Sequence, residues 1–352
     1  MLDLGFYKNK RVLITGHTGF KGTWLTRILV NAGAIVCGYS LEAPTNPNLF
    51  SLAKVEDKIK HVIGDIRDFK HLYSVFEEFK PEIVMHLAAQ PIVRESYRNP
   101  LYTYETNVMG TANVCECVRL VGTVKSFLNV TTDKVYLNED MPDHAFKETE
   151  PLDGYDPYSN SKSCSELVTH SYKKSFFKDM GIAVSTARAG NVIGGGDFAP
   201  DRIIPDCIRA VEAKKDIIVR NPFSTRPYQH VLEPLYIYLI ICEKQYKNKD
   251  FQGYYNVGPD DCDCVSTGDL VTLFCNTWGD KARWVNKYDG GPHEANFLKL
   301  DNWKIKTTFN WRPRWHIKEC VEKICEFTKV YFENKDLIPD EMDKEIKEFF
   351  KL

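Results

Sequence analysis

The chain has 352 residues, which is enough for one large domain or two ordinary ones. Hydrophobic residues make up 43% of it and charged residues 27%, as in ordinary globular proteins. The formal net charge of −2 argues against broad binding to nucleic acid or to acidic membranes, but it allows a local basic site for a small phosphorylated ligand.

We find neither a charged and then apolar signal segment at the N-terminus nor an apolar run of about 18 residues that could span a bilayer. We therefore expect a cytoplasmic protein without a membrane partner. The eleven cysteines form no C-x-x-C pair, and the closest spacings, Cys115/Cys117 and Cys262/Cys264, lack a nearby histidine at zinc-ligand spacing. We expect reduced thiols and no metal.

Apolar strands alternate with helical patterns through the first half of the chain. In chain order, the expected strands are 12–15, 35–39, 61–64, 83–88, 126–131 and 183–188, and the expected helices are 23–31, 71–78, 101–120 and 158–178. This βαβ rhythm is typical of an α/β protein with a Rossmann-like, doubly wound parallel sheet.

Beyond residue 190 the rhythm breaks into loops rich in glycine and proline, and 253–258 returns to strand character. We expect a smaller, discontinuous α/β domain for substrate, formed by about 189–229 plus 259–352. The larger domain would then comprise 1–188 plus about 230–258. The alternating charges of 336–352 suggest only a solvated surface helix.

The stretch "GHTGFKG" at 16–22 places glycines where the first strand passes into the first helix. Glycine permits a tight turn and a close approach of the backbone to a ligand, and the N–H groups at a helix start attract anions. The turn therefore suits a pyrophosphate, although a short glycine pattern alone is a weak signal.

The stretch "YSNSK" places Tyr158 and Lys162 four residues apart, on one face of the expected helix, which Asp156 and Pro157 are suited to begin. An ammonium near a phenol stabilises tyrosinate, which can then take a hydroxyl proton. An isolated pair of this kind is more often accidental. Here the glycine turn and the hydroxyl-bearing strand end "NVTTDKVY" lie in the same chain, and together they favour a catalytic pair.

These motifs, in this order, resemble the extended short-chain dehydrogenase/reductases over nearly the whole chain. "GDIRD" and "LAAQ" match two further parts of that fingerprint. The resemblance implies a bound NAD and a catalytic trio of Thr132, Tyr158 and Lys162. The cofactor-binding residues it implies are Gly16, Thr18, Gly19, Phe20, Lys21, Gly22, Ser40, Asp65, Ile66, Leu87, Ala88, Ala89, Tyr158 and Lys162.

Within that family, "TDKVY" resembles the Thr-Asp-Glu triplet of nucleotide-sugar 4,6-dehydratases, with Asp133 as the acid and Lys134 in place of the usual glutamate. The lysine resembles the CDP-glucose branch. So do "GHTGFKGTWL", "AAQPIVRESYRNP", "RAGNVIGGGDFAPDRIIPD", "RNPFSTRPYQHVLEP" and "PHEANFLKLD". The resemblance implies a lyase that makes deoxysugar nucleotides, for example for polysaccharides.

The chemistry implied by the resemblance starts at the sugar 4-hydroxyl. Tyr158 would take its proton while the C4 hydride passes to NAD⁺, with Thr132 bonded to the same oxygen and Lys162 at the cofactor ribose. A base then removes the C5 proton, Asp133 protonates the departing 6-hydroxyl, and the hydride returns to C6. The product is a 4-keto-6-deoxy sugar nucleotide.

Two hypotheses fit Lys134. In the first, it participates in enolisation at C5, either as a neutral amine that takes the proton or as an ammonium that stabilises the enolate oxygen. Alternatively, it pairs with Asp133 or Glu148 and only orders the loop.

For the CDP-sugar, the resemblance points to Gln90, Asn191, Arg202, Arg226 and His293. Arg226 is the strongest of these because arginine can form paired hydrogen bonds to phosphate. Whether glucose or a heptose occupies the pocket, and how cytosine is selected, stays open.

The preference for NAD rests on the resemblance. NAD-binding folds commonly place an acidic residue at the end of the second strand, where it binds the ribose 2′-hydroxyl. Here Ser40 occupies that position, and Glu42 lies too far beyond the strand to replace it. The short stretch around Ser40 holds no arginine for a 2′-phosphate, which argues mildly against NADP.

Two rival functions share parts of this pattern. A nucleotide-sugar 4-epimerase uses the same Thr, Tyr and Lys but needs no Asp133-Lys134 pair, and an NAD-sensing module would have lost catalysis. The resemblance also implies a homodimer or homotetramer in which helices 101–120 and 158–178 pack against symmetry mates. Apolar positions such as Val114, Val118, Leu167 and Tyr172 support it.

Overall fold

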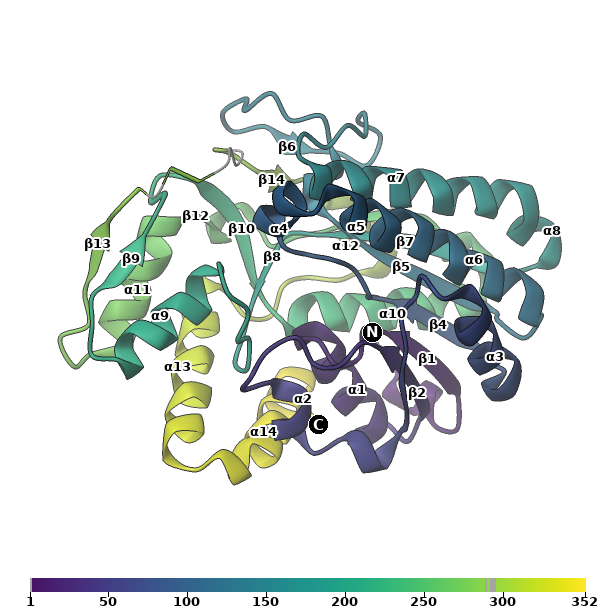
Figure 1. Ribbon diagram of the computed structural model, residues 1–352, viewed down its shortest axis with the longest axis horizontal. Helices are drawn as coiled ribbons and strands as arrows, with labels where there is room; N and C mark the ends of the chain where they lie inside the picture. The colour runs from purple at the N-terminus through teal and green to yellow at the C-terminus, as the bar shows by residue number, and fades with distance from the viewer. Residues whose placement is uncertain (1, 289, 292–295) are drawn as a thin grey trace.

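The computed structural model describes residues 2–288, 290–291 and 296–352. Its centre is a seven-stranded sheet in the order β11-β7-β5-β4-β1-β2-β3, in which every pair of neighbours is parallel (Figure 1). The strands are β1 (Arg11–Thr15), β2 (Ile35–Ser40), β3 (Lys60–Ile63), β4 (Ile83–His86), β5 (Ser126–Thr132), β7 (Ala183–Ala189) and β11 (Tyr254–Val257).

The order of the strands confirms the Rossmann-like, doubly wound α/β prediction. From β1 the chain builds outward through β2 and β3, and it then returns to pair β4 with the other side of β1. Ligands of such sheets bind where the direction of winding reverses, beyond the carboxyl ends of the strands. That point lies between β1 and β4.

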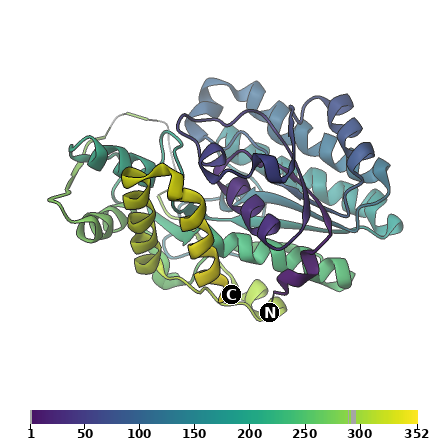
Figure 2. The same cartoon turned by 90° about the horizontal axis from the view of Figure 1, so that it is seen from below.

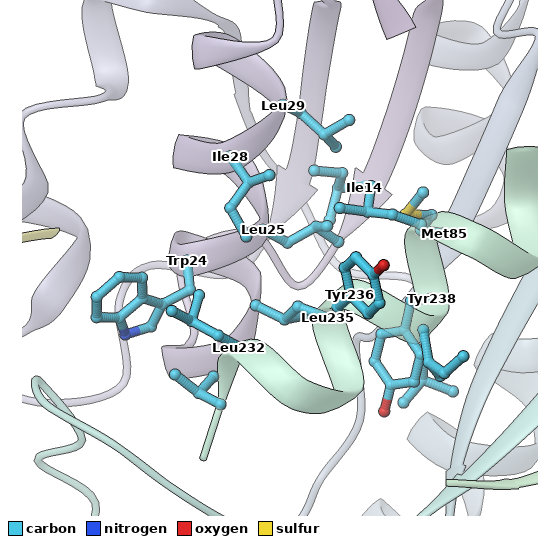
Figure 3. Close-up of a cluster of buried hydrophobic side chains, with 14 of the residues drawn as sticks. Ile14, Trp24, Leu25, Ile28, Leu29, Met85, Leu232, Leu235, Tyr236 and Tyr238 are labelled. Atoms are coloured by element: carbon cyan, nitrogen blue, oxygen red, sulfur yellow. The ribbon is translucent and has the colours of Figure 1, made fainter. Parts of the chain in front are cut away.

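Helices cover both faces of the sheet. On one face, α1 (Phe20–Asn31) and α10 (Leu232–Lys247) bury a large apolar cluster against β1 and its neighbours. Figure 3 shows Trp24, Leu25 and Ile28 of α1 pointing toward Leu232 and Leu235 of α10. On the other face, the second cluster is formed by the sheet with α3 (Phe69–Phe79), α6 (Gly110–Val121) and α7 (Pro157–Tyr172).

Two expected helices are interrupted by a wider turn. Residues 100–121 form α5 (Pro100–Tyr104), a π-helical turn (Glu105–Met109) and α6, and a second π-helical turn (Lys173–Phe177) separates α7 from α8 (Lys178–Met180). In the first turn, the Asn107 side chain accepts a hydrogen bond from the Gln90 N–H (2.8 Å) and donates one to the Gln90 carbonyl (3.1 Å). This tertiary bond accompanies the departure from a regular helix.

The smaller α/β part lies on the left of Figure 1. It contains a sheet of β12 (Cys264–Ser266), β10 (Thr225–His230) and β8 (Asn191–Ile193), a pair β13 (Trp284–Asn286) and β9 (Ile217–Val219), and the helices α9 (Ile203–Glu212), α11 (Thr267–Trp278) and α13 (Ile317–Glu333). These helices and strands bury an apolar cluster of their own. The two-domain division stays our proposal.

The C-terminal helix α14 (Ile338–Phe350) is present, but the expectation of a merely solvated helix is wrong. Ile338, Met342, Ile346 and Phe349 are buried in the cluster formed by α1 and α10. Figure 2 shows α14 beside α1, with the two ends of the chain near each other. The many charged residues of α14 misled the interpretation from composition, and two of them, Glu341 and Glu345, are themselves buried.

The remaining elements are short: α2 (Leu49–Ala53), α4 (Val93–Arg98), α12 (Trp303–Phe309) and the paired strands β6 (Ala145–Phe146) and β14 (Lys299–Leu300). Single 3-10 turns occur at Leu4–Tyr7, Glu56–Lys58, Asp133–Val135, Lys249–Phe251, Asp261–Asp263 and Lys335–Leu337. Among the described residues, none of the helices is both long and apolar enough to cross a membrane.

Candidate active site

A cavity of about 640 Å³ lies at the carboxyl edge of the central sheet and is closed on its other side by the smaller α/β part. Many of the residues that the sequence analysis predicted to be functional line this cavity. Those that line it are Phe20, Lys21, Leu87, Ala89, Thr132, Asp133, Lys134, Tyr158, Lys162, Asn191, Arg202 and Arg226.

Thr132, Asp133 and Tyr158 meet where β5 ends and α7 begins. The Thr132 hydroxyl donates to Asp133 Oδ1 (3.0 Å) and is also hydrogen-bonded to Tyr158. Burial raises the pKa of Tyr158 to about 12, although the Thr132 hydrogen bond and the positive charge of Arg202 lower it. The phenol is therefore protonated at neutral pH and needs nearby positive charge to act as a base.

Asp133 is suited to the role of acid. Its side chain is buried, and burial raises its pKa above the usual range despite the opposing charges of Lys134 and Arg226. Its Oδ2 atom has no hydrogen-bond partner among the described residues. A carboxyl group with a raised pKa and one free oxygen is better suited to donate a proton to a leaving hydroxyl.

Lys162 lies one helical turn after Tyr158 and is buried. Its ammonium donates a hydrogen bond to the Val130 carbonyl (2.9 Å), and burial lowers its pKa to about 8, although the negative charge of Glu166 opposes this. This hydrogen bond holds the ammonium near the end of β5. Because an ammonium has three hydrogens, others remain to donate to a hydroxyl group in the cavity.

Lys134 reaches the cavity without an ion-pair partner in the part of the chain that the structure describes. It pairs neither with Asp133 nor with Glu148, which instead accepts a hydrogen bond from the Asn256 N–H (2.9 Å). Asn256 also bonds the Tyr136 hydroxyl and the Phe146 carbonyl, as expected for a structural residue. The charge of Lys134 still acts on Asp133, so its role in the reaction stays a proposal.

Three positively charged residues, Lys21, Arg202 and Arg226, line the cavity. The Arg202 guanidinium donates to Asp197 (3.0 Å), and Arg226 is almost completely buried on β10, two residues before Tyr228, which pairs with Asn191 on β8. Burial, assisted by the charge of Arg202, lowers the pKa of Lys21 to about 7. This concentration of cations suits a diphosphate.

The turn between β1 and α1 forms a cradle without side chains. Gly16 has a φ of +80°, and a Cβ there would lie 2.7 Å from the Ala88 nitrogen; a Cβ on Gly22 would lie 2.1 Å from the Gly16 carbonyl oxygen. Helix α1 begins after Gly19 with no side-chain cap, so its first N–H groups point toward the cradle. This donor set fits the pyrophosphate of a dinucleotide such as NAD.

Four further expected cofactor residues lie near this turn and the ends of β2 and β3. Thr18 Oγ1 is hydrogen-bonded to Ser40 Oγ (2.9 Å), which places two hydroxyls at the end of β2. Ile66 is buried in the apolar core. Asp65 is bound by Arg67 (2.6 Å) in a second hollow of about 480 Å³, and their contact with the cofactor stays a prediction.

One residue predicted to bind substrate, Gln90, is absent from the cavity lining. The Gln90 side chain donates to Thr103 (2.9 Å) and accepts from the Ile92 N–H (2.6 Å), so its polar atoms hold the chain after β4. It lies outside the cavity lining, and we no longer assign it to the substrate. His293 lies outside the described residues.

Glu166 is a buried residue that motif analysis missed. It accepts hydrogen bonds from Thr131 (2.5 Å), Thr186 (2.8 Å) and Arg188 (2.9 Å), and so joins α7 to β5 and β7 directly behind the catalytic residues. Its position four residues after Lys162 was the available signal, because residues i and i+4 share a helix face.

Replacing Glu166 by Ala is expected to destabilise the protein by about 3–5 kcal/mol, because Arg188 would be left as an unpaired buried charge. Urea unfolding measures this loss. The control Glu322→Gln, which breaks an exposed pair with Lys318, should change stability by only about 0–1 kcal/mol. If both variants lose the same free energy of unfolding, the buried pair stabilises the protein no more than the exposed one.

The chain resembles known proteins over most of its length. The family model for GDP-mannose 4,6 dehydratase matches residues 13–324. The chain is similar to the CDP-glucose 4,6-dehydratase of Salmonella typhimurium, with 46% identity over 344 residues that cover 96% of each chain.

Solved structures extend the similarity of fold to more distant proteins. The dTDP-glucose 4,6-dehydratase of Bacillus anthracis, solved in complex with NAD, has a TM-score of 0.76 at 21% identity and covers 94% of this chain and 99% of its own. The UDP-glucose 4-epimerase of Thermotoga maritima, solved with UDP-glucose, has a TM-score of 0.77 at 20% identity and covers 92% and 99%. The chain therefore belongs to the GDP-mannose 4,6 dehydratase family, as its motifs predicted.

Proposed function

We propose that this protein removes one water molecule from CDP-glucose, with NAD as its cofactor, to give CDP-4-keto-6-deoxyglucose. The observation that carries the proposal is the pairing of two functions in one cavity. Tyr158 with Thr132 suits chemistry at a hydroxyl, and the adjacent Asp133 has a raised pKa and one oxygen without a hydrogen-bond partner among the described residues. The 46% identity with a CDP-glucose 4,6-dehydratase over 96% of both chains supports the choice of substrate.

The residues divide the reaction between them. Bound in the glycine cradle, NAD supplies a hydride acceptor for C4 and the same hydride for C6. Tyr158 takes the proton of the 4-hydroxyl, whose oxygen Thr132 holds, and Lys162 provides donors for the cofactor ribose. After C4 is oxidised the C5 proton becomes acidic, and Lys134 assists its removal. Asp133 gives its proton to the 6-hydroxyl as that group leaves as water.

The cations around the cavity hold the nucleotide diphosphate. Arg226 is the leading residue, because a guanidinium can form two parallel hydrogen bonds to a phosphate. Its charge also lies close enough to Asp133 to affect the pKa of that carboxyl. Arg202 and Asn191 line the same cavity.

Mass spectrometry after incubation with NAD and a panel of CDP-, UDP-, TDP- and GDP-sugars tests the proposal. We expect CDP-glucose to lose one water. An epimerase would leave the mass unchanged and alter the sugar, and a binding module would do nothing. If a CDP-heptose is dehydrated instead of CDP-glucose, our assignment of the sugar is wrong. If a sugar on another nucleotide is dehydrated, our assignment of the base is wrong.

We also propose that the protein is a cytoplasmic homodimer or homotetramer. Val114 and Val118 do not support the interface, because both are completely buried in the core. The exposed apolar side chains on the neighbouring helices are instead Leu101 (78% exposed), Met109 and Leu167. They lie on α5, the π-helical turn and α7, which run along one flank of the sheet in Figure 1.

Sedimentation at micromolar concentration is expected to show a dimer or larger species. Leu101→Glu together with Leu167→Glu should produce monomers, because charges at an apolar interface lose their hydration. Ile35→Glu, at an exposed position elsewhere, is the control. A monomeric wild type would refute the assembly.

A further inference from the structure

Outside the cavity, three side chains with metal-binding chemistry meet in the smaller α/β part. Cys262 and Asp263 lie in the 3-10 turn before β12, and His316 is the residue that caps α13. One ligand atom from each lies within 4.8 Å of the other two. The sequence offered no histidine near Cys262, but the fold brings one from 54 residues away.

Two of the three separations between ligand atoms are close to those of a tetrahedral site, and the third, between Cys262 and Asp263, is within 4.8 Å. Cys262 Sγ lies 3.7 Å from His316 Nδ1, and His316 Nδ1 lies 2.9 Å from Asp263 Oδ2. With zinc–ligand bonds of about 2.0–2.3 Å, tetrahedral ligand atoms lie about 3.3–3.8 Å apart. The first separation already matches, and the second needs an increase of only a few tenths of an ångström to replace the present hydrogen bond.

The surroundings leave the site accessible. The Asp263 side chain is only 3% exposed and is fixed by the Ile317 N–H, which donates to its Oδ1 (2.9 Å). The Cys262 thiol is exposed, and half of the His316 side chain faces solvent. A cation held by these three groups would keep an open position for water as a fourth ligand.

Helix capping accounts for part of this arrangement. His316 forms a capping box with Glu319, and Asp263 bonds the first N–H of α13. Capping gives no role to the thiol of Cys262, whose sulfur lies beside the same imidazole nitrogen. Thiolate, imidazole and carboxylate together form a donor set that zinc accepts.

We propose that Cys262, Asp263 and His316 bind one zinc-type divalent cation. None of the three lines the cavity, so the ion is structural and does not take part in the reaction. It ties the turn before β12 to the start of α13. Because β12 pairs with β10, where Val265 lies opposite Arg226, the ion would stabilise the strand that carries Arg226. This proposal is independent of the proposed activity.

Titration of the metal-free, full-length protein with Co²⁺ is the test, because a thiolate–cobalt bond produces its own near-ultraviolet absorption. Wild type should bind one equivalent and show that band. Cys262→Ser should lose the band, and His316→Asn should bind at least about tenfold more weakly while asparagine retains the helix cap. Cys264→Ser, two residues away, is the matched control and should behave as wild type.

Thermal unfolding with and without Zn²⁺ gives an independent measurement. Wild type and Cys264→Ser should gain thermal stability with Zn²⁺, and Cys262→Ser should not, because a ligand that binds only the folded state stabilises it. Since Cys262 is exposed, its serine variant is expected to fold. Absence of the thiolate–cobalt band in wild type, or its survival in Cys262→Ser, would overturn the proposal.

Discussion

Tyr158→Phe is expected to lower the turnover of CDP-glucose by about 10²–10⁴-fold, the range typical of a lost general acid–base group. The variant removes one oxygen from a residue that lines the cavity and is hydrogen-bonded to Thr132. Because the ring stays, binding of the CDP-sugar should change little. Steady-state kinetics and calorimetric binding of CDP measure the two effects separately.

The matched control for this variant is Tyr73→Phe. Tyr73 lies on α3, which covers the sheet away from the cavity, and its loss of a hydroxyl should leave turnover unchanged. Near-normal turnover of Tyr158→Phe would mean that the spacing of Tyr158 and Lys162 is accidental. Equal loss in both variants would point to a general effect on folding.

Lys134→Met is expected to stop the reaction after C4 oxidation. Lys134 lines the cavity next to Asp133 and makes no ion pair with Asp133 or Glu148 in the described parts of the chain, so its ammonium or amine is available to the substrate. In heavy water, the variant should lose exchange at C5 and loss of water. Oxidation at C4 should persist and appear as reduced cofactor in a single turnover.

Lys147→Met, on the loop after β6, controls for the loss of one positive charge from the same region. If C5 exchange and water loss proceed at the normal rate in Lys134→Met, this lysine has no chemical role. If C4 oxidation is lost as well, Lys134 is needed for substrate binding and not specifically for enolisation. The proposed role of Lys134 at C5 is supported only if C4 oxidation persists while C5 exchange and water loss stop.

Much of the fold was predictable because parallel strands buried on both faces are continuous apolar runs. The expected strand 126–131 corresponds to β5, with one more residue at Thr132, and the expected strand 83–88 contains β4. The cavity likewise collects the expected Thr132, Tyr158 and Lys162, since the motifs stand at strand ends and helix starts, where the fold brings them together.

The contacts that escaped prediction join segments that are distant in the chain. Gln90 belongs to a motif, but its amide is occupied by Thr103 and Ile92, which only the fold places around it. Glu166 gains its partners on β5 and β7 in the same way. The apolar stripe of α14 was visible at helical spacing, yet the surface it covers on α1 lies over 300 residues away.

The central claim is that one sugar molecule is oxidised and reduced in the same cavity, with no net change in NAD. The most direct measurement follows deuterium from C4 of labelled CDP-glucose in the presence of unlabelled competitor. We predict that the label appears at C6 of the 4-keto-6-deoxy product, within the same molecule, without accumulation of reduced cofactor. Absence of deuterium from C6, or its appearance in molecules derived from the unlabelled competitor, would contradict the account.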